Sequence, residues 1–594
     1  MKDLAEAREL LRQADGAKLD ERLQLAKTLE EADLPWPARA SVHVLRNYTA
    51  DPLAPFLKLG GFNRGIRLEV TFSDYDTYEQ DVLDPASALR QSHHDLVVLS
   101  LWLDNLRMAF DREGRLQVEP TITHVRNVVG LLTEQTRATI ALHTFLPPAH
   151  QGGGGAVLRS DDDGLAAINR RLAEMAGGNP RLLLVDLGAL VTEVGRGEAL
   201  DPRYWFMFKA PLKPRLLDAL GGCLAQAVAT LKGLARKVLV LDCDGTLWGG
   251  VVGEDGLDGI KLHANEYPGN AYHAMHKQLL ALRRRGVLLA ICSKNNEADV
   301  LEVLDGHPHC LLRREHLAAW RINWDDKVTN LRALAKELNL GLESFAVIDD
   351  SPVEAALLRG AVPEVDVLEV PRKIFELPGV LQRYSGFDGL AVTAEDEARS
   401  GFYQAQRARD EDAERFGGLE EFLASLELRA EIGPAQPEEV ARIAQLTQKT
   451  NQFNLTTRRY GAGDIEGFMR SPEHLVFVLK VRDRYGEYGL TGVGIAERNG
   501  TDARIDSFLM SCRILGRKLE DALLHELVTE AGRRWGATRV TGHYIATAKN
   551  GLVREFYESR GFSRVAEDGA ARSYAAPLGV AGPAPPAFIH VEKR

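Results

Sequence analysis

The sequence has few cysteines and no long apolar run. Five cysteines occur among 594 residues, and no two of them form a C-x-x-C pair. This spacing indicates neither a disulfide framework nor a zinc site. No segment approaches the roughly twenty apolar residues that a membrane helix needs, and the charged first thirty residues lack the apolar core of a signal peptide. We therefore expect a cytoplasmic protein with no membrane partner.

An excess of positive charge is also absent. The chain carries 73 Lys and Arg against 84 Asp and Glu, a formal net charge of −11. Proteins whose main partner is nucleic acid neutralise phosphates with basic residues, so we expect no nucleic-acid partner. With 45% hydrophobic and 26% charged residues the composition is that of a globular protein, and 594 residues predict three or four domains.

The most informative stretch runs from Lys237 to Gly250. Residues 238–241 form a short aliphatic run, typical of a strand buried in a parallel sheet, and Asp242 and Asp244 follow where that strand should end. Carboxylates at such a strand end lie over the crevice where open α/β sheets bind ligands. The first can attack a phosphoryl group, and the second can serve as general acid and later as base. We therefore predict phosphoryl-transfer chemistry here.

Two further residues of this stretch fit the same chemistry. Gly245 allows a tight turn, and the hydroxyl of Thr246 could hold a phosphate oxygen. The competing interpretation is structural, because Asp-Gly is a common turn sequence in any loop.

Three downstream stretches favour the catalytic interpretation. Ser293 follows a second aliphatic run and precedes Asn295, Lys327 supplies a cation, and Asp349 and Asp350 end a third aliphatic run. The adjacent carboxylates would repel unless a divalent cation lay between them and Asp242. Taken singly, each feature could be a helix cap, a solvated charge or a turn. Taken in this order, Asp-x-Asp, Ser, Lys and Asp-Asp resemble the four motifs of the haloacid dehalogenase (HAD) phosphatase superfamily.

The spacing between these motifs indicates an open site. About fifty residues separate Asp242 from Ser293, and about thirty separate Ser293 from Lys327. Neither interval has room for the cap domain that HAD enzymes of small metabolites insert. We expect a nearly capless site that accepts a phosphate presented by a large partner or another domain.

The chain before residue 214 predicts two amphipathic helices followed by an α/β domain. Its layout resembles the SGNH-hydrolase-like domain that precedes some HAD domains. However, Asn47, Tyr48 and Thr49 stand where a Gly-Asp-Ser nucleophile is expected, and residues 201–204 read Asp-Pro-Arg-Tyr where an Asp-x-x-His is expected. We therefore expect this domain to dock or position a partner, not to hydrolyse esters.

The chain after residue 427 predicts a helix, three consecutive strands, a second helix and a further strand. This order resembles the GNAT acyltransferase fold, in which a loop at a helix N-terminus holds the pyrophosphate of coenzyme A. Arg513 and Gly516 match that loop, but Lys518 replaces its last small residue. We expect weak coenzyme A binding, while a pantetheine arm remains plausible.

Cys512 is the candidate nucleophile of this last region. It precedes a predicted helix and is flanked by Arg513 and Arg517, an environment that favours a reactive thiolate. The alternative is a small residue buried in the core, the commoner fate of a free cysteine. His543 could act as its base, or it could be a structural histidine.

Together, these motifs resemble the FkbH-like proteins of polyketide biosynthesis. The resemblance rests on LWGGVVG at 247–253, SKN at 293–295, INWDDK at 322–327, IDDSPVE at 348–354, residues 450–460 and MSCR at 510–513. Members load 1,3-bisphosphoglycerate onto an enzyme cysteine, remove the remaining phosphate and pass the glyceryl group to the phosphopantetheine of an acyl carrier protein.

The resemblance implies a role for each candidate residue. Cys512 would carry the acyl group, and Asp242 and Asp244 would be phosphatase nucleophile and acid/base. Ser293 and Lys327 would hold the transferring phosphoryl group. Mg²⁺ would be held by Asp242, Asp244, Asp349 and Asp350, and the substrate by Thr246, Asn295, Asn451, Arg458, Arg513 and Lys549.

The fold class that we expect is multidomain α/β, with an SGNH-like domain, a capless HAD domain and a GNAT-like α+β domain. The expected boundaries are N-terminal helices at 1–40, the SGNH-like domain at 41–213, the HAD domain at 214–385, a helical linker at 386–427, the GNAT-like domain at 428–576 and a Pro-rich tail at 577–594. An alternative function is a HAD phosphatase for another metabolite or glycan precursor, fused to an acyltransferase that uses coenzyme A.

Overall fold

The computed structural model describes residues 4–14, 17–32, 34–148, 163–389, 409, 416, 418–547 and 549–594. Two compact units are present, one of Met1–Gly233 with Arg459–Gly467 and one of Leu234–Arg458 with Phe468–Arg594. Most of the predicted linker at 386–427 lies outside the described residues. Among the described helices, none combines the length and apolar character needed to cross a membrane.

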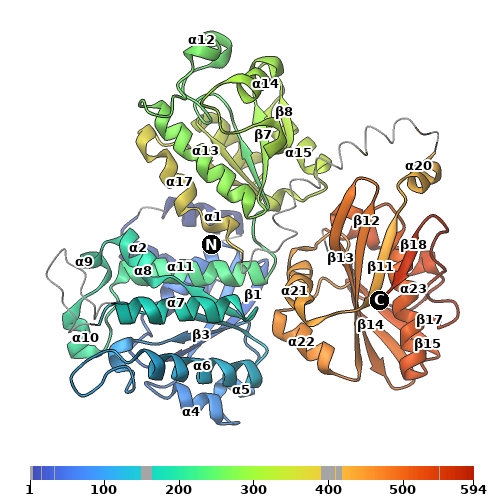
Figure 1. The fold of residues 1–594 in the computed structure, drawn as a ribbon, viewed down its shortest axis with the longest axis horizontal. Coiled ribbons are helices and arrows are strands. Elements are labelled where there is room, and N and C mark those ends of the chain that lie inside the picture. Colours follow the sequence, from blue (N-terminus) through green and yellow to red (C-terminus); the bar gives the residue numbers. More distant parts are fainter. Residues whose placement is uncertain are drawn as a thin grey trace. The chain divides into compact units, whose positions relative to one another are not determined.

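The first unit contains a five-stranded parallel sheet (Figure 1). Its strands follow the order β2-β1-β3-β4-β5. Every residue of β3 and of β4 is buried, as expected of a sheet that is covered on both faces. The strands are β1 (Ala38–Arg46), β2 (Ile66–Phe72), β3 (Leu96–Ser100), β4 (Thr139–His143) and β5 (Leu182–Val185).

Helices surround this sheet. One face packs against α6 and α7 through a shared apolar core, and α11 packs closely against α3. The helices are α1 (Leu4–Gln13), α2 (Leu19–Glu31), α3 (Leu53–Asn63), α4 (Tyr78–Leu83), α5 (Ala88–Gln91), α6 (Val118–Gln135), α7 (Asp163–Gly177), α8 (Leu187–Val194), α9 (Arg196–Ala199), α10 (Pro202–Phe208) and α11 (Pro214–Leu231).

Helix α11 corrects one predicted boundary. The sequence predicts that residues 214–233 belong to the HAD domain, whereas the structure places them in the first unit. Two glycines explain the close packing with α3, because a Cβ at Gly60 would lie 2.9 Å from the Cβ of Ala225, and one at Gly221 would lie 2.8 Å from the backbone of Phe56. An apolar helix face does not itself specify which neighbouring sheet it covers.

The second unit begins with another five-stranded parallel sheet. Its order is β10-β9-β6-β7-β8, so β6 is central and β7 and β9 are its neighbours. Parallel pairing brings the carboxyl ends of all three strands to one edge. The strands are β6 (Val238–Leu241), β7 (Leu288–Ser293), β8 (Leu317–Ile322), β9 (Phe345–Asp349) and β10 (Asp366–Glu369).

The segment between β6 and β7 holds α12 and α13, and α13 packs into the same core as the sheet. This is a crossover connection and not an inserted cap domain. The helices of this part are α12 (Val252–Gly259), α13 (Gly269–Arg284), α14 (Glu297–Gly306), α15 (Lys327–Glu337), α16 (Pro352–Ala361) and α17 (Leu377–Arg383).

The second unit also contains an eight-stranded mixed sheet, in the order β16-β17-β15-β14-β13-β12-β11-β18. Most neighbours are antiparallel, but β14 and β15 run parallel over only four residue pairs. The strands are β11 (Arg429–Pro434), β12 (His474–Asp483), β13 (Gly486–Asn499), β14 (Asp502–Met510), β15 (Arg539–Ile545), β16 (Ser563–Asp568), β17 (Ala571–Pro577) and β18 (His590–Lys593). The helices are α20 (Leu419–Ser425), α21 (Val440–Lys449), α22 (Ala462–Arg470) and α23 (Leu519–Trp535).

The last strand corrects the prediction of a Pro-rich tail at 577–594. Strand β18 pairs in parallel with β11, and Ile589 is buried in the core of the sheet. The prolines of this segment lie before β18, so they do not interrupt its pairing.

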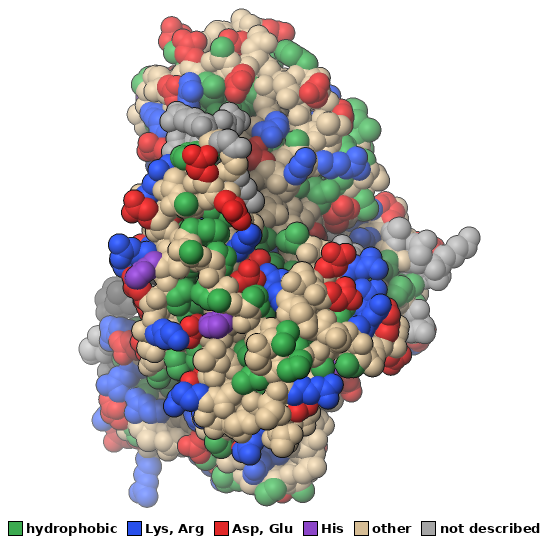
Figure 2. Space-filling model, turned by 90° about the vertical axis from the view of Figure 1, so that its right-hand side faces the viewer, with side chains coloured by type: hydrophobic (Ala, Val, Ile, Leu, Met, Phe, Trp, Pro, Cys, Tyr) green, Lys and Arg blue, Asp and Glu red, His purple; other side chains and the backbone are tan. Residues whose placement is uncertain are grey.

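The surface carries charge of both signs. On the face drawn in Figure 2, basic and acidic side chains are interspersed with apolar ones, and neither sign forms one continuous field. This agrees with the modest net charge of the chain.

Candidate active site

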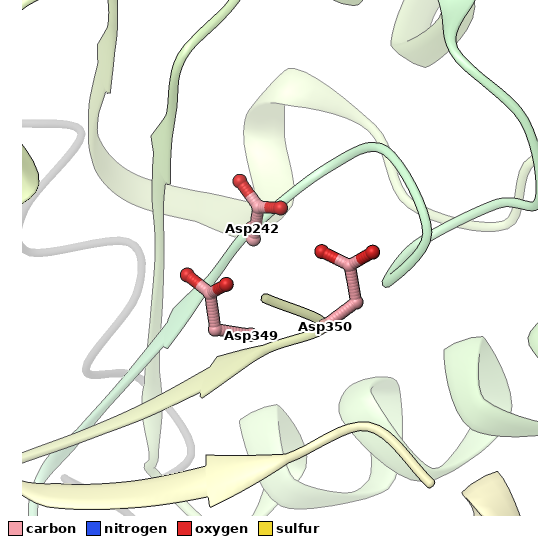
Figure 3. Close-up of side chains that lie close together, drawn as sticks. All are labelled: Asp242, Asp349 and Asp350. Carbon is pink, nitrogen blue, oxygen red and sulfur yellow. The ribbon is translucent and has the colours of Figure 1, made fainter. Parts of the chain in front are cut away.

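Three carboxylates meet at the carboxyl edge of the β6–β10 sheet. Asp242 follows β6, Asp349 ends β9, and Asp350 follows it. One oxygen from each lies within 4.8 Å of the others, and Figure 3 shows the three side chains around one space. Asp242 is held in place because its backbone N–H donates to the carbonyl of Ile348, 3.1 Å away. The two strands therefore fix the acids relative to each other.

Lys327 bridges two of these acids. Its Nζ lies 2.9 Å from Asp242 Oδ1 and 2.5 Å from Asp349 Oδ2, and all three side chains are nearly or fully buried. Burial alone would lower the pKa of Lys327, but the two carboxylates outweigh it and raise that pKa. Lys327 is the first residue of α15, and Asp326 caps this helix by accepting from the backbone N–H of Thr329. The cap orients the turn that carries the lysine.

Asp242 is strongly influenced by its surroundings. Burial raises its pKa and the Asp349 charge adds to this effect, while Lys327 and a hydrogen bond from Ser293 oppose it; the net result is a pKa of about 6. Ser293 is the last residue of β7 and is buried. Ser293 and Lys327 therefore both contact the predicted nucleophile.

Asp244 lies outside the group of three acids whose oxygens meet, so its place among the four predicted metal ligands stays a prediction. Its Oδ1 accepts hydrogen bonds from Trp248 Nε1 at 2.8 Å and from the backbone N–H of Val252 at 3.0 Å. Its Oδ2 accepts from Asn295 Nδ2 at 2.7 Å. These donors orient the Asp244 carboxylate, so Asn295 acts on Asp244 in this structure.

Thr246 is the remaining predicted residue of this loop. It is fully buried, and its Oγ1 has no hydrogen-bond partner among the described residues. A buried hydroxyl without a partner is costly, so this atom is suited to accept or donate to a ligand.

The donor set fits a divalent cation. Three carboxylates carry three negative charges, and Lys327 offsets one of them. Burial and the Asp349 charge raise the pKa of Asp350, as expected of acids that repel one another. Hard oxygen ligands of this kind are those that Mg²⁺ prefers. Asp242, Asp349 and Asp350 would therefore hold the ion, and it would stabilise charge on a phosphoryl group.

Cys512 lines a separate cavity of about 320 Å³ within the second unit. Residues from the parallel sheet side and from the mixed sheet side contribute to its wall: Lys237, Leu288, Asn339, Leu340, Gly341, Glu343, Ser344, Arg442, Leu446, Lys449, Thr450, Asn451, Gln452, Phe453, Met510, Ser511, Cys512, Arg513 and Lys549. Cys512 is half-buried, whereas Cys243, Cys292 and Cys310 are buried. Of these four cysteines, Cys512 is the one that lines this cavity.

The cavity is strongly cationic. Its lining includes five basic residues and one acid, Glu343. The predicted substrate residues Asn451, Arg513 and Lys549 all belong to this lining. Glu343 contacts two of them, since its Oε1 lies 2.8 Å from Lys549 Nζ and accepts from Asn451 Nδ2 at 3.5 Å.

Three residues predicted to act at this site, namely Arg458 for the substrate and Arg517 and His543 for the thiol, make other contacts. Arg458 forms an ion pair with the buried Asp506. The guanidinium of Arg517 lies 4.7 Å from the ring centre of Tyr488 and 3.8 Å from the Asp483 carboxylate. His543 Nδ1 is 3.0 Å from the Ser573 hydroxyl. These three side chains do not line the cavity around Cys512.

The local structure at Cys512 also differs from the prediction. Cys512–Ile514 form a short 3-10 turn after β14, and α23 begins only at Leu519. The thiol therefore does not lie at the N-terminus of α23. Ser511 caps the turn by accepting from the backbone N–H of Arg513.

The two centres lie at opposite edges of one sheet. Lys237 precedes β6 and lines the thiol cavity, as do Leu288 at the start of β7 and Ser344 just before β9. Asp242 follows the same strand at its other end. Five residue steps separate Lys237 from Asp242, which corresponds to about 16 Å along an extended strand. The sheet itself therefore lies between the thiol cavity and the acids.

Residues 453–455 fill the gap where β14 and β15 part. The backbone N–H groups of Met510 and Leu455 donate to Phe453 and Phe508, and the N–H of Ile545 donates to Leu455 at 2.9 Å. This segment thus pairs with both strands. An extended ligand cannot pair there while it is in place.

The first unit uses its candidate positions for internal contacts. Asn47 is fully buried and bonds both backbone groups of Trp102, and Tyr48 bonds the Ser100 hydroxyl at 2.8 Å. Asp201 caps α10 and accepts from Arg203. These residues hold loops together at the positions where the hydrolase pattern would place its catalytic groups.

Sequence reasoning missed Lys237, Glu343, Arg442 and Lys449 as members of the thiol cavity. Lys237 was recognised only as the residue before a strand. No local pattern identifies them, because they lie far apart in the chain and meet only through tertiary packing.

Comparison with known proteins supports the fold of the chain only in part. No family model and no curated protein matches this sequence. The N-terminal part of BF1531 from Bacteroides fragilis, which contains a phosphatase domain complexed with Mg, is 24% identical with a TM-score of 0.57. The match covers 62% of this chain and 99% of that chain, and at this identity it shows a shared fold.

Two N-acetyltransferases are further structural matches. The ribosomal-protein-S18-alanine N-acetyltransferase from Escherichia coli is 17% identical, with a TM-score of 0.20, over 25% of this chain and 94% of that chain. The PaiA N-acetyltransferase from Thermoplasma acidophilum, in complex with coenzyme A, is 14% identical, with a TM-score of 0.19, over 25% of this chain and 98% of that chain.

Proposed function

We propose that this protein is a bifunctional glyceryl transferase and phosphatase. It loads 1,3-bisphosphoglycerate onto Cys512, removes the remaining phosphate at Asp242 and transfers the glyceryl group to the phosphopantetheine of an acyl carrier protein. The observation that carries the proposal is that Cys512 opens into a cavity with five basic residues, in a chain that also holds a buried acid cluster suited to phosphoryl transfer.

Loading begins at the thiol. The Cys512 sulfur attacks the acyl carbon of the mixed anhydride, the bond from this carbon to the phosphate oxygen breaks, and inorganic phosphate leaves. An acyl phosphate is activated enough for a thiolate to react without a strong base. Arg513 and Lys549 in the cavity wall are suited to hold the donor's phosphates.

Dephosphorylation takes place at the acid cluster. An oxygen of Asp242 attacks the phosphorus, and Asp244 protonates the leaving alcohol oxygen and then accepts a proton from the attacking water. Ser293 and Lys327 contact Asp242 and stabilise charge on the transferring group. Asp242, Asp349 and Asp350 would hold Mg²⁺, which would supply further charge stabilisation, and the similar BF1531 fragment was crystallised with Mg.

The acyl group has to travel between the two centres. Since the sheet separates the cavity from the acids, the part that carries Cys512 must move relative to the sheet during the cycle. The absence of a cap between β6 and β7 leaves the acid cluster open to such a large approaching group.

The alternative, an acyltransferase that uses coenzyme A, fits less well. Residues 453–455 occupy the opening between β14 and β15 and pair with both strands. They leave the thiol cavity as the described approach to Cys512. A carrier's pantetheine thiol would there attack the thioester carbonyl and release Cys512.

We also propose that the first unit is an SGNH-like domain without hydrolase activity that docks or positions the carrier. Asn47, Tyr48 and Asp201 are engaged in internal hydrogen bonds, which supports a structural role for these positions. A cytoplasmic location and the polyketide pathway belong to the same proposal.

Intact-protein mass spectrometry tests the two chemical steps. After incubation with 1,3-bisphosphoglycerate, the Cys512→Ala variant is expected to gain no acyl group, whereas Asp242→Asn is expected to accumulate the phosphorylated acyl group. Cys223→Ala, which changes a half-buried cysteine of the first unit, serves as the matched control and loads normally.

The same measurement separates the competing functions. Protein-bound glyceryl after incubation with 1,3-bisphosphoglycerate, and no acetyl after incubation with acetyl coenzyme A, supports the proposal. An acyl group that remains on Cys512→Ala would place the nucleophile elsewhere. Acetylation without glyceryl loading would favour the alternative.

A further inference from the structure

Glu343 is the one carboxylate among the residues that line the thiol cavity. It lies in the turn Leu342–Ser344 before β9, so it belongs to the parallel-sheet part. Its partners Lys549 and Asn451 belong to the mixed-sheet part. The carboxylate therefore reaches across the cavity to two groups suited to bind an anion.

The position of this carboxylate is built into the turn. A Cβ at Gly341 would lie 2.2 Å from Glu343 Oε2 and 2.6 Å from Oε1. Gly341 has a φ of −73°, which any residue adopts, so its backbone does not require glycine. Glycine here leaves the space into which the Glu343 side chain folds.

Glu343 is charged at neutral pH. Burial alone would raise its pKa, but the hydrogen bond and charge of Lys549 outweigh burial and lower it. A half-buried carboxylate in contact with Lys549 and Asn451 satisfies them in the same way as a phosphate oxygen. It therefore competes with any anion that enters the cavity.

We propose that Glu343 is a specificity-determining residue that occupies the anion site beside Cys512 until a multiply charged phosphorylated donor displaces it. A neutral or weakly charged compound gains nothing by displacing Glu343, because it cannot replace the lost ion pair. A phosphate with two negative charges can replace that ion pair with Lys549. Displacement also breaks the Glu343–Lys549 contact between the two parts, which frees them to move. This inference rests on the proposed function only in its choice of donor.

Alkylation of Cys512 tests the inference without the donor. Glu343→Gln and Gly341→Ala both remove the carboxylate from its place, the first by neutralising it and the second by occupying its space. Iodoacetate, an anion, is expected to modify Cys512 about fivefold faster in both variants, since one unit charge nearby in a watery site is worth about that factor. Iodoacetamide, which is neutral, corrects for any change in the thiolate fraction, so the fivefold gain is read from the ratio of the iodoacetate rate to the iodoacetamide rate. Peptide mass spectrometry reports each rate.

Two variants serve as matched controls. Glu369 lies on β10 of the same sheet and pairs with Arg359, and Glu369→Gln removes its charge. Gly360→Ala adds a methyl group where a Cβ meets open space. Both are expected to match the wild-type protein with both reagents. Cys223 provides an internal reference rate in every sample.

Inorganic pyrophosphate gives a second readout. It is expected to protect Cys512 from iodoacetamide at about fivefold lower concentration in Glu343→Gln than in the wild-type protein. The inference would be overturned if Glu343→Gln and Gly341→Ala were alkylated at the wild-type rate and if pyrophosphate protected them at the same concentration as it protects the wild-type protein. If the variants behave as expected but 1,3-bisphosphoglycerate loads no variant at all, the proposed function fails while the role of Glu343 stands.

Discussion

Lys327 connects two strands of the parallel sheet at the level of single atoms. Its Nζ contacts Asp242 after β6 and Asp349 at the end of β9. A buried charge of this kind is costly unless it is paired, and here it is paired twice. The lysine therefore serves the fold and the chemistry together.

Lys327→Met is expected to lower phosphatase turnover by at least about 100-fold, because the cation that stabilises transferring charge is lost. It should also destabilise the metal-free protein by about 3–5 kcal/mol, the usual cost of leaving buried charges unpaired. Phosphate release and thermal unfolding with and without Mg²⁺ check both effects. Mg²⁺ should restore part of the stability by balancing the acids. Lys336→Met, on the exposed side of the same helix, is the control; equal losses in both variants would contradict this role.

Thr246→Val separates a ligand-binding role from a structural one. Since Thr246 Oγ1 is buried and has no hydrogen-bond partner in the described part of the chain, replacing the hydroxyl by a methyl group should leave the melting temperature unchanged or slightly higher. The KM for the phosphorylated substrate should rise about two- to tenfold, the value of one hydrogen bond. Steady-state kinetics and thermal unfolding measure the two effects, and Thr246→Ser should restore the KM. A large loss of stability would show that the hydroxyl is structural.

At the scale of secondary-structure elements, the strand ends were the most predictable part of the chain. The aliphatic runs before Asp242 and Asp349 indicate buried strands, and β6 and β9 end at these acids. Parallel pairing then brings them together. The sequence did not reveal which groups orient Asp244, because its donors Trp248 and Asn295 come from a turn and from another strand end.

Elements that depend on long-range packing were not predictable. Helix α11 has an apolar face that could cover either neighbouring sheet, and close contacts at Gly60 and Gly221 decide the choice. The thiol cavity depends on residues from both sheets meeting at the amino edge of β6. The periodicity of apolar residues identifies the buried face of a single helix or strand, but it does not show which other element packs against that face.

Strand β18 is predicted to stabilise the mixed sheet. Ile589, just before it, is buried in the core of that sheet. Ile589→Ala should cost about 2–5 kcal/mol through lost burial and a cavity, and each kcal/mol should lower the melting temperature by about 2–4 °C in a domain of this size. Val580→Ala, at an exposed position of the same segment, is the control for calorimetry. Identical melting temperatures in both variants would mean that the strand adds nothing to the sheet.

At the scale of the whole molecule, the two candidate centres are separate in space. The acids gather at the carboxyl edge of one sheet, while the thiol cavity lies at its amino edge and holds no member of the acid cluster. A treatment that affects one centre should therefore leave the other working.

Removal of Mg²⁺ with a chelator is expected to stop phosphate release while Cys512 still takes up one phosphorylated acyl group per chain. The acids lose the cation that balances their charge, whereas the basic residues around the thiol need none. Intact-protein mass spectrometry measures the bound group, and added Mg²⁺ should convert it to the dephosphorylated form. Loss of loading on chelation would show that the centres are coupled.

The four residues of β6 set a fixed distance between Lys237, which lines the thiol cavity, and Asp242, which belongs to the acid cluster. Insertion of one residue would turn every later side chain of the strand to the opposite face. Insertion of two would keep the facing but move Asp242 by about 7 Å past Asp349. The length of this short strand therefore fixes how far Asp242 lies from the thiol cavity.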